Sequence, residues 1–521
     1  MGSIWTGLTG LDTYSDAISV VSNNMANVNT TGFKSSRVLF SDLVSALAGG
    51  TCDGSQVGTG VGVGSVSLTT STGGYATTNS TLDMAIDGED GYFQVRNSLN
   101  DKTYYTRAGA FNFNTSGYLI NSQGLRVQGW QVDQTALNAA DDAGTTLSEV
   151  PITGDQTDIQ ITDFTLPAKA TSSVRLVTNL DSETEIESTD ATDPYFAMFK
   201  NYDATSDTLA NDADYSTSIT VYDAEGTTHD MTVYYKKAAS SDGKEYWEYM
   251  VTMAPSEDGN STTSGTTKAG VLMIGTMTFG SDGTLENQTA YTLADGTTDP
   301  TSLSSWTQAK LSTADGVPEF SATFLSASSG SVLSSQTIAF ATGLSVNDAT
   351  WSSSNPTTAA GIGSNAAANA GYDISKTKNA IHSTTNYATT SYTLTNSADG
   401  YTSGLLKNTY VDDDGVIYGL FSNGQSKALW VLALADFTNK SGLTSEGNNL
   451  YSASDDAGVM TIGRANSGKF DGVAGNTLES SNVELATEMT NLIIYQRAFE
   501  SNSKVVTTAD EMMQKAMQIV R

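Results

Sequence analysis

The chain has 521 residues, too many for one hydrophobic core, and its hydrophobic content of 38% is sufficient for several folded domains. Its net charge of −32 argues against nucleic acid or anionic lipid as a partner, because an acidic surface repels both. Cys52 is the only cysteine, which excludes an intrachain disulfide, and we expect an ordinary thiol there. No apolar run reaches transmembrane length, and no basic residue precedes Lys34, so we expect neither membrane embedding nor a cleaved secretory signal.

The N-terminal segment carries one apolar stripe whose members recur every three, four or seven residues. This spacing predicts a helix over about residues 3–27. The stripe consists of Ile4, Leu8, Leu11, Ile18, Val21 and Met25. A polar run from Asn27 to Gly32 then supplies stop signals, since glycine adopts positive φ readily and asparagine tolerates it.

The next segment, residues 33–72, is polar and rich in glycine, and we interpret it as a linker or hinge. Within it, "GTGVGVG" (58–64) superficially resembles a dinucleotide-binding fingerprint. That fingerprint needs its third glycine three places after the second, where Val63 stands, and a strand and helix around it. We therefore expect a flexible passage and no nucleotide site.

From about residue 73 onward the apolar period changes to two, which is typical of β-strands. Four stretches predict a strand, a tight turn and a second strand. They are "FNFNTSGYLI" (111–120), "ITVYDAEGTTHDMTVYY" (219–235), "MTFGSDGTL" (277–285) and "YVDDDGVIYGLF" (410–421). In the last, three consecutive aspartates and Gly415 favour a hairpin turn over a calcium loop, whose ligands alternate along the chain. Residues 355–395 show little periodicity and predict a loop or return linker.

The C-terminal segment mirrors the first, with a second apolar stripe at helical spacing that reaches the end of the sequence. This stripe includes Leu485, Met489, Leu492, Phe499, Val506, Met513 and Val520. Ser481 or Asn482 is the expected N-cap. Gln496 and Ser503 interrupt a strict heptad seam, which requires apolar residues at these two positions.

The fold class predicted from this pattern is a mixed α and β multidomain protein. Its long terminal helices form a coiled-coil-like inner domain, and β-rich inner and outer domains are inserted between them. Residues 1–33 and 482–521 carry net charges of only −2 and −1, which leaves −29 for the middle of the chain. Because a single amphipathic helix cannot bury its stripe alone, we expect the two ends to pack on each other or on neighbouring copies, and the middle to face solvent.

Residues suited to catalysis or to metal binding form no recognisable pattern. His229 lies beside a predicted hairpin turn and His382 in the predicted return linker, and we expect both at the surface. A carboxylate pair for glycoside hydrolysis depends on the fold, and 57 acidic residues give no reason to choose any one pair. The sequence therefore predicts no catalytic, cofactor or metal site.

One signature is more specific than these patterns. "VVSNNMANVNTTGFKSSRVLFSDL" (20–43) resembles the N-terminal signature of the bacterial flagellar axial proteins, the rod and hook subunits. Residues 478–521, with "SNV" at the start and "QRAFESNSKV" at the centre, resemble that family's closing helix. "LDMAIDGEDGYFQV" (82–95) and residues 104–130 resemble its inner β-domain. The signature residues carried over from the family are Asn23, Asn24, Asn27, Asn29, Thr30, Gly32, Phe33 and Lys34.

The resemblance implies a domain plan. Residues 1–32 and 478–521 correspond to the polymerisation domain, 33–72 to a hinge segment, 73–150 and 397–477 to a discontinuous inner domain, and 151–396 to one or two outer domains. This large insertion favours the hook type over the rod type, which generally lacks it. Residues 400–451, which begin "GYTSGLLKNTYVDDDGVIYGLF", resemble the returning half of the inner domain.

The resemblance also implies a function, a location and partners. The expected role is a structural subunit that is exported unfolded, polymerises into a curved hollow tube outside the cell and transmits torque as a universal joint. The implied partners are further copies in a helical polymer, the rod, the hook cap, hook-length control and hook–filament junction proteins, and the type III export gate. "FSDLV", from Phe40 to Val44, resembles the segment that family members present to that gate.

Two alternatives remain open from the sequence. One is a distal rod or other hook–basal-body component, against which the large insertion argues. The other is a surface glycan-binding or glycan-cleaving protein with β-domains, which the acidic, Ser/Thr-rich middle permits but which leaves both terminal helices unexplained.

Overall fold

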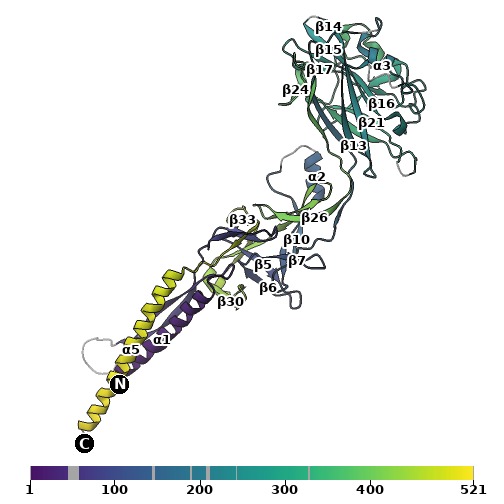
Figure 1. Cartoon of the computed structure of the whole chain (residues 1–521). Helices are drawn as coiled ribbons and strands as arrows, with labels where there is room; N and C mark the ends of the chain where they lie inside the picture. Colours follow the sequence, from purple (N-terminus) through teal and green to yellow (C-terminus); the bar gives the residue numbers. More distant parts are fainter. Residues whose placement is uncertain are drawn as a thin grey trace.

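The computed structural model describes residues 2–44, 58–142, 147–187, 190–206, 212–241, 243–326 and 329–519. The molecule is elongated, with two helices at one end, a β-rich inner domain in the middle and a β-rich outer domain at the far end (Figure 1). Both ends of the chain lie at the helical end (Figure 1). Cys52 and Val520 lie outside the described residues.

Helices α1 (Gly2–Ala26) and α5 (Leu485–Ile519) match the two predicted terminal helices. They run antiparallel, because Asn24 near the end of α1 bonds Glu488 near the start of α5, while Gly7 lies against Val506. The C-terminal part of α5 extends beyond the start of α1 (Figure 1). We call the two helices together with the hairpin described next the stem.

Part of the segment expected to be a linker is instead a β-hairpin. Strands β1 (Ser36–Val44) and β2 (Gly58–Leu68) pair antiparallel along the helices. The hydroxyl of Thr13 in α1 donates to the carbonyl of Val61 in β2 at 3.0 Å. The glycines of "GTGVGVG" therefore belong to a strand that lies close to α1, and the expectation of a flexible passage there is wrong.

The inner domain is built from one branched sheet of fourteen short strands among the described residues. Its strands are β5 (Tyr92–Arg96), β6 (Thr103–Thr106), β7 (Asn112–Phe113), β8 (Leu119–Ile120), β9 (Arg126–Val132), β10 (Ile152–Asp158), β11 (Thr165–Leu166), β26 (Gly404–Val411), β27 (Val416–Phe421), β28 (Ser426–Leu432), β29 (Leu434–Phe437), β30 (Leu443–Gly447), β31 (Leu450–Ala453) and β32 (Met460–Gly463). Two small pairs complete it, β3 (Tyr75–Thr77) with β34 (Thr477–Glu479) and β4 (Met84–Asp87) with β33 (Gly472–Gly475). Helix α2 (Gln134–Asp142) follows β9.

The inner sheet continues beyond residue 150, where the sequence analysis placed the border of the outer region. Strand β10 pairs with β9, and β11 pairs with β26 from the returning half. The chain thus leaves the inner domain only after Leu166 and returns just before Gly404. Composition does not change at this border, so the sequence carried no signal for it.

The outer domain is a sandwich of two sheets that share one hydrophobic core. The larger sheet contains β13 (Tyr215–Tyr222), β14 (Thr228–Ser241), β15 (Lys244–Met253), β16 (Val271–Phe279), β17 (Leu285–Gln288), β18 (Tyr291–Leu293) and β19 (Trp306–Gln308). The smaller contains β12 (Ser173–Asn179), β20 (Lys310–Leu311), β21 (Pro318–Ala322), β22 (Gln336–Ala341) and β25 (Tyr392–Ala398). A small pair, β23 (Leu344–Val346) and β24 (Thr377–Asn379), lies beside them.

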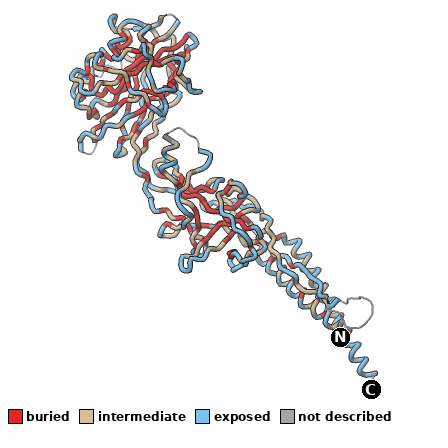
Figure 2. The backbone as a smooth tube through the Cα atoms, turned by 180° about the vertical axis from the view of Figure 1, so that it is seen from behind, coloured by how far each residue is buried: buried red, intermediate tan, exposed pale blue. Residues whose placement is uncertain are grey.

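A second core covers the other face of the larger sheet, where Phe196, Phe199 of α3 (Ala197–Asn201) and Trp306 pack. Every residue of β16 is consequently buried, because both faces of this strand are covered. Buried backbone runs through the interior of the outer domain (Figure 2). The two cores lie on opposite faces of one sheet, so residues 173–398 form a single outer unit.

The structure tests several local predictions. All four predicted hairpins are present, as β7–β8, β13–β14, β16–β17 and β26–β27. In the last turn the carboxylate of Asp412 accepts from the backbone N–H groups of Asp414 and Val416, which is turn chemistry. Residues 355–395 are mostly irregular but contribute the buried Ile362 and Tyr372 to the outer domain, so they are not only a linker.

The prediction that His229 lies at the surface is wrong. Its ring is buried, stacked on Phe324 at a centroid distance of 4.0 Å, with Asp223 and Glu257 at its two ring nitrogens. The carboxylates approach to 3.1 and 2.8 Å. His382 is exposed, as predicted.

Candidate self-assembly surface

Helices α1 and α5 of the stem approach each other closely. A Cβ built on Gly7 would lie 2.8 Å from Val506, and one built on Gly10 would lie 2.7 Å from the side chain of Asn502. These two glycines therefore allow α1 to approach α5 more closely than larger residues could. On α5, the residues opposite these glycines are Val506 and Asn502, while Ala498 is half-buried and Ala509 is buried.

An aromatic cluster ties the hairpin to both helices. Tyr14 of α1, Phe40 of β1 and Tyr495 of α5 lie within 5.5 to 6.1 Å of one another, centroid to centroid. Tilted and edge-to-face arrangements of this kind add about 0.5–1.5 kcal/mol per pair beyond the area that they bury. One ring from each of three elements thus fixes their relative positions near the middle of the stem.

The predicted interface residues divide into two groups. Val21 is buried within the stem, and Ile4, Leu11, Ile18, Met25, Leu492 and Val506 are half-buried. Leu8, Leu485, Met489, Phe499 and Met513 are exposed. Pairing within one chain therefore covers only part of the stripe that the sequence identified.

Other exposed apolar residues of the stem were not predicted. They are Trp5, Leu39, Leu43, Val66, Ile493, Ile494, Val505, Met512 and Met517. A signal for several was present, because Ile493–Ile494, Val505–Val506 and Met512–Met513 are adjacent apolar pairs. Adjacent residues on a helix differ in direction by about 100°, so such pairs need burial on more than one side. Exposed apolar residues therefore lie on all three elements of the stem, α1, the hairpin and α5.

The signature residue Asn24 fixes the end of α1 to the hairpin and to α5. Asn24 is buried, and its side chain both accepts from the N–H of Ser36 at 3.0 Å and donates to the carbonyl of Ser36 at 2.8 Å. It also donates to Glu488 of α5 at 3.2 Å. A single asparagine therefore joins the helix end, the first strand of the hairpin and the start of α5.

A buried ion cluster lies next to it. The ammonium of Lys34 lies 2.6 Å from one carboxylate oxygen of Glu479, and the guanidinium of Arg107 lies 3.4 Å from the other. All three side chains are almost fully buried. Burial and the nearby Arg107 lower the pKa of Lys34, while Glu479 opposes both effects. Lys34 also donates to the carbonyl of Ser71 at 2.8 Å.

The remaining signature residues shape the turn between α1 and the hairpin. Gly32 adopts a φ of 67°, and a Cβ there would meet the backbone N of Ala108 at 2.6 Å, so only glycine fits. Thr30 donates to the side chain of Asn27, whose amide bonds back to the carbonyl of Asn23. Asn29 is exposed and Phe33 half-buried. We call Asn24, Lys34, Arg107, Glu479 and Asn482 the joint.

The sequence predicts Asn482 as a helix N-cap. In the structure its side chain bonds to the segments before and after the β1–β2 hairpin. Its side chain accepts from the N–H of Ser35 at 2.7 Å and donates to the carbonyls of Thr69 and Ser71. The joint thus connects the start of α5 to the segments before and after the β1–β2 hairpin.

The segment resembling an export signal is the first strand of the hairpin. Phe40 is partly exposed on β1 while its ring contacts Tyr14 and Tyr495, and Val44 is paired through its backbone with Gly58.

The inner and outer domains are joined by two chain segments that bond to each other. Lys169 and Tyr401 exchange backbone hydrogen bonds at 2.9 and 3.0 Å. Asp399 accepts from the backbone N–H groups of Ser172 and Ser173 and from the Ser172 hydroxyl. Burial raises the pKa of Asp399, but these hydrogen bonds outweigh that effect and lower it overall. The connection is therefore a two-stranded ribbon with its own hydrogen bonds.

Chemistry that could indicate another type of site was also sought. Across the described ranges, no three His, Cys, Asp or Glu side chains are grouped in a way that could hold a metal ion. Within the same ranges, no helix combines the length and apolarity that crossing a membrane requires.

Comparison with known protein families matches four successive parts of the chain. The models are described as flagella basal body rod protein (residues 4–34), flagellar hook protein FlgE/F/G D1 domain (85–174), flagellar basal body protein FlaE D2 domain (179–401) and flagellar basal body rod FlgEFG protein C-terminal (474–519). The first and last cover the stem helices and most of the joint.

Full-length relatives carry one description. The flagellar hook protein FlgE of Treponema pallidum is 30% identical over 100% of both chains, and that of Escherichia coli K12 is 27% identical over 97% of both. Among solved structures, Helicobacter pylori flagellar hook protein FlgE2 aligns with 78% of this chain and 99% of its own, at 14% identity and a TM-score of 0.41. With end-to-end similarity to the first two, this chain belongs to the flagellar hook protein FlgE family, whose members are structural subunits of the bacterial flagellum.

Proposed function

We propose that this chain polymerises into the curved tube of the hook through the exposed apolar surface of its stem, and that the tube transmits torque as a flexible joint. The observation that carries the proposal is the surface left uncovered after α1 and α5 have paired. Leu485, Met489, Ile493 and Phe499 remain exposed along one helix although its partner is in place. Removing apolar surface from water contributes about 25 cal/mol of stabilisation for each Å². Contact between this surface and neighbouring copies is therefore favourable.

The geometry of the stem supports a helical polymer over a closed dimer. The exposed apolar residues of the stem are distributed over three elements, α1, α5 and the hairpin. An interface between different patches of identical chains generates an open helical polymer when its rotation does not close a ring. The stem then forms the inner wall, with the inner and outer β-domains outside it.

The joint and the two-stranded ribbon suggest how stiffness is distributed. The joint is buried and held by ion pairs and by side chains that bond backbone on several elements. The ribbon consists of two segments that bond to each other, and through Thr171 and Thr402 it also bonds to Tyr222 of the outer domain and Asn423 of the inner domain. We infer that stem and inner domain move together, while bending of the tube is accommodated at residues 167–172 and 399–403.

The other implied properties follow as part of this proposal. The subunit functions mechanically and not as an enzyme, at the outside of the cell, after export through the type III gate. Its partners are the rod, the hook cap, the length-control and junction proteins, and chiefly further copies of itself.

The experiment compares two isoleucine substitutions. Ile493→Glu places a charge on the exposed apolar surface of α5, where the residue is 58% exposed. Ile381→Glu makes the same change on the outer domain, where Ile381 is 98% exposed. Both monomers should fold with wild-type circular dichroism. Only Ile493→Glu should fail to form tubes in salt-induced polymerisation followed by electron microscopy, and cells carrying it should lack hooks. Normal tubes from Ile493→Glu would refute the proposed surface.

A further inference from the structure

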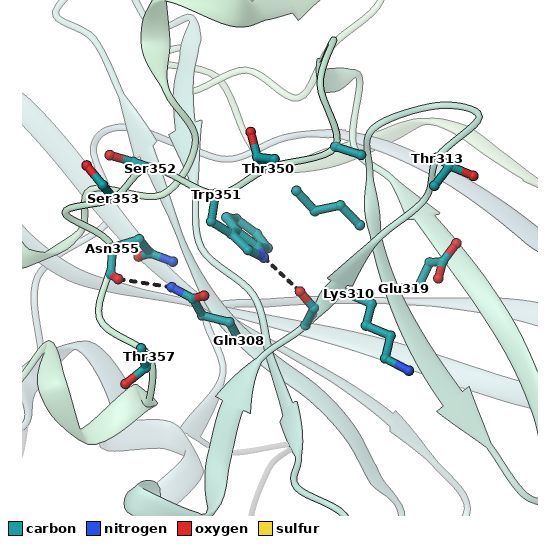
Figure 3. A pocket seen from close by; sticks show the side chains of 13 residues that line it. Gln308, Lys310, Thr313, Glu319, Thr350, Trp351, Ser352, Ser353, Asn355 and Thr357 are labelled. Carbon is teal, nitrogen blue, oxygen red and sulfur yellow. Dashed lines mark hydrogen bonds between the residues drawn. The ribbon is translucent and has the colours of Figure 1, made fainter.

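The outer domain has a surface depression that polymerisation and torque do not explain. It has a volume of about 750 Å³ and is formed by the β19–β20 edge, β21 and the loop at residues 349–357 (Figure 3). Small-molecule sites typically occupy about 300–1,000 Å³. We propose that this depression binds a neutral oligosaccharide, with Trp351 as its stacking platform.

Trp351 is held in a fixed orientation at the centre of the depression (Figure 3). Its indole N–H donates to the carbonyl of Ala309 at 2.7 Å. One face of the ring stacks on Tyr372, with centroids 4.9 Å apart and an angle of 14° between the planes. A partly exposed ring that is anchored at its nitrogen and supported from one side loses little entropy when a flat, apolar ligand face packs against it.

The surrounding side chains can pair with both donors and acceptors of a polyhydroxylated ligand. Gln308 donates to the backbone carbonyls of Asn355 and Pro356, which fixes its amide at the wall of the depression. Glu319 and Lys310 face each other across the β20–β21 pair, and Thr350 and Ser353 supply exposed hydroxyls. Sugar hydroxyl groups both donate and accept, so this mixture suits them.

One buried donor in the wall is unsatisfied. Asn355 is only 5% exposed, its Oδ1 accepts from Tyr291 and Gly371, and its Nδ2 has no hydrogen-bond partner among the described residues. Figure 3 shows this amide directed toward the ring of Trp351. An unpaired buried donor costs about 1–3 kcal/mol, which an oxygen entering beside Trp351 would offset.

The loop that carries the tryptophan is also strained. Ala349 has a φ of 46°, a region that residues with a Cβ rarely adopt. Strain of about 1–3 kcal/mol persists where surrounding structure imposes it, and here it sets the turn that presents Trp351.

Charge selects among ligand classes. The lining contains one cation, Lys310, and one anion, Glu319, which balance. The chain as a whole carries −32, so its field disfavours anionic ligands such as nucleotides or acidic glycans. A neutral oligosaccharide carries no such penalty, and its flat ring face complements the indole.

The test is isothermal titration calorimetry of the full-length monomer with four probes, namely cellotetraose, maltotetraose, xylotetraose and N,N′,N″,N‴-tetraacetylchitotetraose. At least one should bind with a dissociation constant of about 1 mM or tighter. Saturation-transfer NMR should show the bound sugar protons next to an indole ring. Absence of binding by all four at 5 mM would overturn the proposal, as would preferential binding of a proline-rich peptide at this site.

Three variants and one control test whether this site, and not the overall fold, is responsible for binding. Trp351→Ala should weaken binding at least ~10-fold, and Trp351→Phe, which keeps a ring on Tyr372, should weaken it less. Glu319→Gln should weaken binding ~3-fold or more without affecting the core, since Glu319 is half-buried at the rim. Tyr392→Ala, a half-exposed aromatic residue on β25, is the matched control and should leave binding unchanged. Equal affinity in wild type, Trp351→Ala and Glu319→Gln would assign any observed binding elsewhere and refute the site.

Discussion

At the scale of single residues, Glu479 is the side chain on which the stability of the joint depends most. This carboxylate is the shared partner of two buried cations, Lys34 and Arg107, and it also accepts from the N–H of Gly73 at 3.1 Å. Removing one member of a buried ion cluster leaves the others uncompensated, which is far more costly than breaking an exposed pair.

We therefore predict that Glu479→Ala lowers the free energy of unfolding by about 3–5 kcal/mol. Urea unfolding of the monomer, followed by circular dichroism, measures this. The matched control is Glu446→Ala, which removes a partner of Lys102 in a half-exposed pair at 2.9 Å. It should lower the free energy of unfolding far less, because solvent-exposed ion pairs contribute little to stability. Similar losses in the two variants would mean that the buried cluster contributes little.

The second residue-scale prediction concerns pH. Glu248 is fully buried, and burial raises its pKa to about 8 although the N–H groups of Met198 and Phe199 donate to it. Between the ordinary pKa of 4.5 and 8, the unfolded state loses this proton while the folded state retains it. The free energy of unfolding should therefore fall as pH rises through this window, by up to about 1.4 kcal/mol per pH unit.

Lys268 has the opposite dependence. Burial lowers its pKa to about 8, and its ammonium donates to the carbonyls of Phe199 and Tyr202 at 2.6 Å each. Stability should consequently rise again between pH 8 and 10.5, giving the outer domain a minimum near pH 8. Thermal unfolding at pH 5, 6.5 and 8 tests the lower arm. Glu248→Gln should flatten it, and an unchanged slope in this variant would show that Glu248 is not the cause.

His229 illustrates what sequence reasoning could not reach at this scale. Asp223 is close in sequence, but Glu257 and the stacking partner Phe324 come from distant parts of the chain. A lone histidine beside a turn gives no sign of such a setting. Gly32 is the converse case, because the position of a glycine after an asparagine-rich helix end predicted the positive φ that the structure contains.

At the scale of elements, the terminal helices could be predicted and the hairpin could not. The apolar spacing located α1 and α5 to within a few residues. In β2, glycines at alternate positions leave one face without side chains, which hides the period of a strand. At Gly60 the reason is tertiary, since a Cβ there would lie 2.0 Å from the hydroxyl of Thr9 on α1.

This contact gives an element-scale prediction. Gly60→Ala should push β2 away from α1, both through that overlap and because Gly60 has a φ of 126°. Hydrogen exchange of the β1–β2 amides should accelerate at least ~10-fold, and polymerisation should weaken. Gly58→Ala is the control in the same strand, because a Cβ there meets nothing within 4 Å. Equal protection of the hairpin in both variants would contradict the proposed role of the glycine.

At the same scale, the residues of one predicted stripe differ in how far the partner helix covers them. Leu492 and Val506 are half-buried within the stem, whereas Leu485, Met489 and Phe499 from the same stripe are exposed. A single stripe in a sequence does not say how many partners cover it. Only the structure separates residues already covered by α1 from residues still in need of a neighbour.

At the scale of the whole molecule, charge is concentrated in the β-domains, while exposed apolar residues are dense on the stem. The stem carries a small net charge and 15 of the 32 large apolar residues that are exposed in the described part of the chain, while the β-domains hold most of the −32. Under the proposed function, stems associate while like-charged domains point outward into solvent, where salt screens them. The order of domains was readable from the sequence, but the border near residues 167–172 was not, since it depends on which sheet accepts β10 and β11.

The central claim is that neighbouring copies cover the surface that one stem leaves exposed. Hydrogen–deuterium exchange of the monomer and of the assembled tube tests it most directly, because amide protection reports local opening. The account predicts that amides of residues 505–519 of α5 exchange at least ~10-fold more slowly in the tube, while those of the fully buried β16 remain unchanged. Unchanged exchange along α5 on assembly, with new protection confined to the outer domain, would contradict it.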